Sequence, residues 1–145
     1  MSIQKDTWTA FKNQLRNDTA LSAYVNRFKF NRQEEIFNES MFPLVVCYIP
    51  AIVEEEYIGI PKQKLAKLTI ECYGKIHATA GDDLEDEVLV IDAHLKNAIE
   101  KNLTMSGVCV QINLSDSTFE MLDKEYIETH FTARVTLQRF TAGAR

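Results

Sequence analysis

Strict alternation of apolar and polar residues from 127 to 137 is the pattern that most constrains the fold of this chain. Alternation over so long a run predicts a β-strand with one buried face and one solvated face. The expected inward residues are Ile127, Thr129, Phe131, Ala133, Val135 and Leu137. The expected outward residues are Glu128, His130, Thr132, Arg134 and Thr136. Such a strand requires a sheet beside it and a layer of other elements over its apolar face.

Three further segments have the character of strands. Residues 65–73 alternate in the same way, with Ala66, Leu68, Ile70 and Cys72 expected on the buried face. Residues 42–49 are β-branched and aromatic, are apolar on both faces and are bounded by Pro43 and Pro50, which favours a strand covered on both sides. Residues 108–114 alternate again and predict a strand with one solvated face.

Helical spacing marks three segments. The strongest prediction is a helix after Gly81 that begins at a cap supplied by Asp82 or Asp83, carries acidic residues in its first turn and ends near Asn102. Its buried stripe is Leu84, Val88, Ile91, Leu95 and Ile99. Trp8, Phe11 and Leu15 predict an N-terminal helix with Asp6 as its cap. Leu21, Tyr24 and Val25 predict a short helical turn capped by Asp18 or Thr19.

The predicted order is helix, strand, long loop, strand, helix, strand, long strand. A chain of 145 residues is long enough for one domain, and no repeat or linker divides it. We therefore expect one α+β domain over residues 1–145. It is a single-domain sandwich in which N-terminal and central helices cover a mostly antiparallel or mixed sheet, with a long projecting loop or β-arm.

The segment from 51 to 64 is too long for a tight hairpin and holds the candidate functional residues. These are Glu54, Glu55, Glu56, Tyr57 and Ile58. Two interpretations stay open. The acidic run can be the solvated tip of a loop, or its apolar flanks can dock on another subunit while the carboxylates face a shared space.

Charge and composition exclude several classes of protein. The net charge of -5 argues against a nucleic-acid binder with a basic surface, although the first 33 residues carry +4 and the remainder carries -9. The three cysteines have no close cysteine neighbour, so we expect free thiols in a reducing compartment. The start of the chain lacks the pattern of a signal peptide, and no apolar run reaches the length of a membrane span.

The sequence predicts no catalytic, cofactor-binding or metal-binding residue. His77, His94 and His130 lack the spacing of a helical metal site, and the five glycines form no phosphate-binding loop. The carboxylates between Asp82 and Glu87 are expected to be solvated groups at a helix start rather than a cation site. The cysteines are expected to be small apolar residues in strand interiors.

The order of these patterns resembles the tail terminator (tail completion) proteins of long-tailed bacteriophages. The resemblance covers most of the chain and consists of patterns of apolarity. It is carried by Trp8, Phe11 and Leu15; Leu21-Ser-Ala-Tyr-Val25; Phe42-Pro-Leu-Val-Val46; Leu68-Thr-Ile-Glu-Cys-Tyr73; Asp83-Leu84 with Val88, Ile91, Leu95 and Ile99; Gly107-Val108; and residues 135–138.

The resemblance implies a non-enzymatic virion protein, made in the host cytoplasm and located in the tail and neck. Members of that family form rings, usually hexamers, which cap the head-proximal end of the tail tube, stop its polymerisation and join the tail to the head. The implied partners are further copies of the chain, the tail tube protein and a head-tail connector or head-closure protein. DNA passes through the ring without sequence-specific binding, and no membrane is involved. Residues 50–64 would then be an intersubunit clasp or a loop facing the lumen.

Three other functions remain as alternatives. A head-closure or connector protein of the phage neck is similar to a tail terminator in size and also assembles into rings. A small cytosolic ligand-binding domain would use its half-exposed sheet face as the binding surface. A hydrolase would need a nucleophile beside a histidine, which the order of residues does not suggest.

Overall fold

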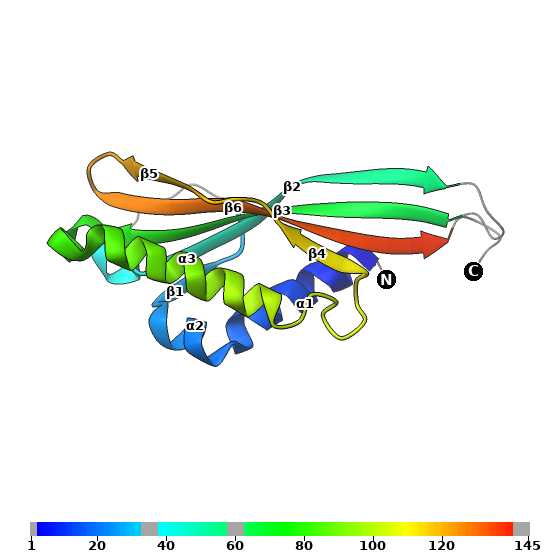
Figure 1. Ribbon diagram of the computed structural model, residues 1–145, viewed down its shortest axis with the longest axis horizontal. Coiled ribbons are helices and arrows are strands. Elements are labelled where there is room, and N and C mark those ends of the chain that lie inside the picture. The colour runs from blue at the N-terminus through cyan, green and yellow to red at the C-terminus, as the bar shows by residue number, and fades with distance from the viewer. Residues whose placement is uncertain (1–2, 33–37, 58–62, 141–145) are drawn as a thin grey trace.

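The computed structural model describes residues 3–32, 38–57 and 63–140 and places three helices along one face of a long twisted sheet (Figure 1). The sheet has the strand order β1-β2-β3-β6-β4, with β5 also paired to β6. Only β1 and β2 pair in parallel. The predicted α+β fold with a mixed, helix-covered sheet is confirmed. In chain order the elements are α1 (Ile3–Asn17), α2 (Thr19–Tyr24), β1 (Arg27–Lys29), η1 (Glu39–Met41), β2 (Leu44–Tyr57), β3 (Gln63–His77), η2 (Ala78–Asp83), α3 (Leu84–Glu100), β4 (Gln111–Leu114), β5 (Thr118–Leu122) and β6 (Tyr126–Phe140).

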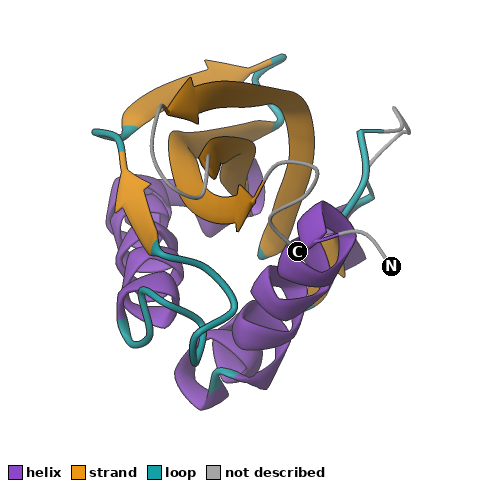
Figure 2. Ribbon diagram, turned by 90° about the vertical axis from the view of Figure 1, so that its right-hand side faces the viewer, coloured by secondary structure: helices purple, strands orange, loops and turns teal. Residues whose placement is uncertain are grey.

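The two longest strands, β3 and β6, pair antiparallel without interruption from Gln63↔Phe140 to His77↔Tyr126. Their alternation confirms the sequence prediction, because all six residues of β6 expected to point inward are buried. The same holds for Ala66, Leu68, Ile70 and Cys72 of β3. In Figure 2 the sheet curls strongly, as expected for long twisted strands.

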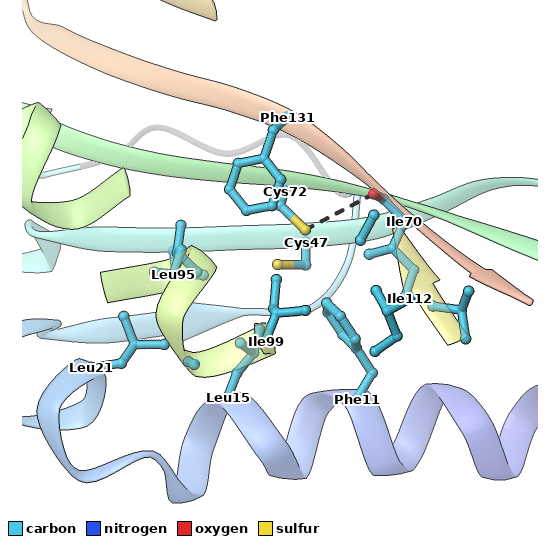
Figure 3. Close-up of a cluster of buried hydrophobic side chains, with 14 of the residues drawn as sticks. Phe11, Leu15, Leu21, Cys47, Ile70, Cys72, Leu95, Ile99, Ile112 and Phe131 are labelled. Atoms are coloured by element: carbon cyan, nitrogen blue, oxygen red, sulfur yellow. Dashed lines mark hydrogen bonds between the residues drawn. The ribbon is translucent and has the colours of Figure 1, made fainter. Parts of the chain in front are cut away.

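The core forms where the helices pack on the inward face of the sheet. Figure 3 shows Phe11, Leu15 and Leu21 of the first two helices directed toward the sheet residues Cys47 and Ile70. From α3, the predicted stripe contributes Val88, Ile91, Leu95 and Ile99, each at most 1% exposed. Burial of this apolar surface is the main stabilising contribution to the fold.

Asp18, one of the two caps that the sequence offers, is the N-cap of helix α2. The Asp18 carboxylate accepts a hydrogen bond from the backbone N–H of Leu21 at 2.9 Å and forms an ion pair with Lys101. Burial alone would raise the pKa of Asp18, but the Lys101 ammonium and the Leu21 amide outweigh it and hold that pKa below the ordinary value. Asp6 is not a cap, because α1 begins at Ile3 and Asp6 lies within its first turn.

The sequence misplaced several strand boundaries. The strand expected over 108–114 is only β4, because Met105, Ser106 and Gly107 adopt positive φ angles and keep the chain in turns up to its start. Cys109 is therefore buried outside a strand, contrary to prediction. The short strands β1 and β5 were not predicted. The strand expected over 42–49 continues past Pro50, and residues 51–57 form the second half of β2.

At Gly74, Ile91 of α3 packs tightly against the sheet. A Cβ atom at this position would lie 3.0 Å from Cγ2 of Ile91 and 3.1 Å from Cγ2 of Thr129. We expect Gly74→Val to lower the free energy of unfolding by about 1–3 kcal/mol because it overpacks this contact. The matched control Ala51→Val, at an exposed position of β2, should change the free energy of unfolding by less than about 0.5 kcal/mol. Urea unfolding measures both, and equal stability of the two variants would contradict the close packing of α3 on the sheet.

Candidate interaction surfaces

A three-stranded arm extends from the body of the protein past the helices (Figure 1). It consists of residues 51–57 of β2, 63–69 of β3 and 134–140 of β6, paired through Tyr57↔Gln63 and Gln63↔Phe140. Of the two structures expected for this segment, a loop or a β-arm, the β-arm is the one observed. The sequence predicts the strand that contains residues 134–137 but not its place in the arm, because these residues lie far from 51–64 along the chain.

The β2 ladder is broken at the base of the arm. The pairing with β3 shifts between Tyr48 and Ala51, after which Ile52 pairs with the buried residue Leu68. The positions of the Glu54 to Tyr57 side chains, and Ile58 as a whole, lie outside the described residues. Their role at a lumen or a subunit contact stays a prediction.

The arm has a strand edge and apolar side chains open to solvent. Residues 51–57 of β2 pair with β3 on one side, and among the described residues no strand pairs with the other side. Ile52 and Val53 are 46% and 50% exposed. An edge strand presents unpaired backbone N–H and C=O groups, so this edge is a template for pairing with another chain.

A polar and aromatic network occupies the sheet face away from the helices. The Tyr73 ring stacks on the His130 ring with centroids 4.4 Å apart, and the Tyr48 ring stacks on Tyr73 at 5.9 Å. His130 Nε2 contacts the Glu71 carboxylate, which also accepts a hydrogen bond from the Thr132 hydroxyl at 3.2 Å. Burial and the bond to Tyr48 raise the pKa of Tyr73, and the negative charge of Glu71 adds to this shift.

The network continues into a buried ion pair. Lys75 contacts the Glu128 carboxylate, and both residues are almost fully buried. The Lys75 ammonium lies over the Tyr126 ring at 4.7 Å and over the Tyr73 ring at 5.2 Å. Glu128 was expected to be solvated, but Lys75, Tyr126 and the second apolar cluster cover this end of the outer face. That cluster contains Met41, Phe42, Leu44 and Val46.

Cys47 and Cys72 pair directly across β2 and β3, but the three histidines lie elsewhere. His94 packs on Tyr24, the Nδ1 of His77 accepts a hydrogen bond from the Thr79 amide, and His130 lies on the outer face. Cys47 and Cys72 are buried on the inner face, so the sheet separates them from His130. Burial raises the pKa of the Cys72 and Cys109 thiols, which disfavours the thiolate needed for nucleophilic attack.

The acidic residues between Asp82 and Glu87 lie where η2 meets α3. Asp83 precedes the helix but its side chain makes no capping hydrogen bond, and Glu85, Asp86 and Glu87 occupy the first turn. A hollow of about 390 Å³ nearby is lined in part by His77, Asp83 and Glu87. In the described part of the chain, no three His, Cys, Asp or Glu side chains are arranged to hold a metal ion.

None of the described helices is both long and apolar enough to cross a membrane.

The comparisons with known proteins identify no family. No protein-family model matches the sequence, and no curated protein matches it. Among solved structures, the chain is similar to one from a structure described as the virion of a native gene transfer agent particle. The two are 14% identical with a TM-score of 0.40, and the match covers 89% of this chain and 93% of the other. A likeness at this level carries no inference about what this chain does.

We expect the Lys75–Glu128 pair to show strong energetic coupling. Lys75→Met should cost about 3–5 kcal/mol of stability because it leaves the Glu128 carboxylate buried without its cation. Lys75→Met combined with Glu128→Leu should cost much less than the sum of the single changes, since aromatic rings already surround the site. The half-exposed Lys96, 4.0 Å from Asp92, provides a control for which Lys96→Met should cost at most about 1 kcal/mol. Strictly additive effects in urea unfolding would show that the pair is not coupled.

Proposed function

We propose that this chain is a structural protein of a phage-like virion, with no enzymatic activity and no cofactor. The chain forms a ring, expected to be a hexamer, on the head-proximal end of a tail tube. The ring stops tube polymerisation and joins the tail to a head connector or head-closure protein. DNA passes through its centre without sequence-specific binding.

The observation that carries the proposal is the arm. Its three strands extend past the helices that cover the rest of the sheet, and its β2 edge and the side chains of Ile52 and Val53 are open to solvent. In a monomer the inward side chains of β3 and β6 are buried in the arm, but the β2 edge and the side chains of Ile52 and Val53 stay in contact with solvent. A neighbouring subunit that covers the arm would bury its apolar side chains and pair its edge, as in strand-addition contacts between chains.

The motifs that carry the resemblance to tail terminators fall on defined elements of the fold. The Leu-x-x-Tyr-Val motif spans the second half of α2, the Phe-Pro-Leu-Val-Val motif leads into β2, and Asp83-Leu84 opens α3. In a ring whose subunits contact one another head to tail, an arm that reaches the next subunit is a direct way to form the contact.

The acidic run has two possible roles in such a ring. Glu54, Glu55 and Glu56 belong to the β2 strand of the arm. If the arm lines the lumen, these carboxylates repel DNA phosphates and let the genome slide. If the arm meets a neighbour, these residues belong to the clasp between subunits.

We expect the purified protein to limit the growth of its cognate tail tube. Light scattering coupled to gel filtration should show a species several times the mass of the 16.6 kDa chain, alone or after addition of tail tube protein. Tubes polymerised in its presence should be capped at one end and shorter than tubes polymerised alone, because a bound ring blocks further subunit addition. As a control, the same mass of an unrelated small acidic protein should leave tube length unchanged.

The proposal fails if the protein stays monomeric at every concentration and salt tested, with or without tail tube protein. Binding to filled heads but not to tails would favour the head-closure alternative instead. A stable monomer or dimer that retains a small molecule would favour the ligand-binding alternative.

A further inference from the structure

One edge of the sheet carries a basic surface built on aromatic rings. Beside β1, the Phe28 and Phe30 rings stack with centroids 5.7 Å apart, and the Trp8 ring of α1 meets Phe30 edge-on at 6.0 Å. Cations lie over these rings and on the neighbouring sheet face. We call this surface the basic edge, and its residues are Trp8, Lys12, Arg16, Arg27, Phe28, Phe30 and Arg32.

Three of the four cations of the basic edge lie over aromatic rings. The Arg16 guanidinium lies 4.6 Å from the centre of the Phe30 ring, and the Lys12 ammonium lies 5.4 Å from that of Trp8. The Arg32 guanidinium lies over Tyr48 and donates a hydrogen bond to the carbonyl of Ile49. Side chains that are already ordered lose less conformational entropy when a partner binds.

The opposite edge of the sheet is acidic around an apolar centre. Ser117 and Thr129 each donate a hydrogen bond of 2.6 Å to the Asp92 carboxylate, which ties the start of β5 to α3. Phe119 and Met121 pair with the inward residues Thr129 and Ile127, so they lie on the helix side of β5. These two side chains are 43% and 42% exposed. On α3, one turn before Asp92, Leu89 is 56% exposed.

Exposed carboxylates lie on β5, in the turns at its two ends and in the first turn of α3. We call the whole surface the acidic edge, and its residues are Glu85, Leu89, Asp116, Phe119, Glu120, Met121, Asp123 and Glu125. Lys124 is the one basic side chain in the turn between β5 and β6. By contrast, the described residues 3–32 contain only two carboxylates, Asp6 and Asp18, and Asp18 is buried against Lys101.

We propose that the basic edge of one copy of this chain docks on the acidic edge of a second copy. This inference rests on the proposed function, for which it supplies the two surfaces that close the ring. The strand order places β1 at one edge of the sheet and β5 against β6 at the other, so the two surfaces are distinct and lie on opposite sides. Contact between two different surfaces of identical chains is head to tail, which generates a ring when the rotation closes.

The chemistry of the two surfaces is complementary. Each has an apolar or aromatic centre and a charged rim, the usual anatomy of a protein interface, and the rims have opposite sign. Two basic edges or two acidic edges would repel each other, so a symmetric contact between like edges is disfavoured. Charge complementarity therefore selects a second copy as the partner.

Charge reversal tests the contact. The first variant carries Arg16→Glu and Arg27→Glu, and the second carries Glu85→Lys and Asp116→Lys; all four side chains are exposed. Each variant alone should assemble at least about tenfold more weakly than the wild type in analytical ultracentrifugation, because like charges then meet at every interface. Mixed in equal amounts, the two variants should recover assembly, since alternating subunits restore opposite charges at each contact. One chain that carries all four changes should also recover it.

A matched control carries Glu39→Lys and Glu100→Lys, which change the net charge by as much as the second variant at exposed sites outside the acidic edge. This control should assemble like the wild type. Circular dichroism should show that every variant is folded, since the substituted side chains are all exposed.

The outcomes separate this inference from the proposed function. Rings that form equally well from either reversed variant, or a mixture that does not recover assembly, would overturn the docking of these edges and leave the ring itself standing. A wild-type protein that never assembles would overturn both. If the first variant instead loses binding to double-stranded DNA while its assembly is unchanged, the basic edge is a nucleic-acid surface and the inference is wrong.

Discussion

The uninterrupted antiparallel ladder between β3 and β6 is the constraint on which the rest of this structure depends. From Gln63↔Phe140 to His77↔Tyr126 it runs through both the body and the arm. At the end of the ladder near β5, the inward residues of β3 and β6 pack against α3. At the opposite end the same two strands extend beyond the helices. The arm is therefore a continuation of the core sheet rather than a separate loop. A one-residue slip in this register would exchange every inward and outward side chain.

The ladder also separates an apolar core on its inner face from a polar network on its outer face. Cys72 and Phe131 pair on the inner face and belong to the apolar core, whereas Tyr73 and His130 pair on the outer face and belong to the polar network. The outer face combines stacked rings with the buried Lys75–Glu128 pair, and their polar groups are largely satisfied by one another. Exposed apolar side chains lie along the arm and on β5, among them Ile52, Val53 and Phe119. The proposed function uses these surfaces for contacts between chains.

The sequence predicts those elements whose apolar period is long and regular. The stripe of α3 and the alternation of β6 are visible without a structure, because each is repeated over several turns or residue pairs. Strand β1 has three residues and β5 five, too few for a period to be recognised. Residues 51–57 contain three consecutive glutamates, which favour a loop locally, and pairing with β3 overrides that preference. The stack of Tyr48, Tyr73 and His130 depends on the register between strands far apart in the chain, which no local pattern contains.

The account rests on one claim, that identical chains contact each other head to tail and close into a ring. The rotational symmetry of the purified assembly tests this claim most directly, and class averages from electron microscopy measure it. The account predicts closed rings with a single rotational axis and an open centre, in which the arm of each subunit contacts the next. Particles with two-fold symmetry, in which like surfaces of two subunits face each other, would contradict it, as would isolated monomers.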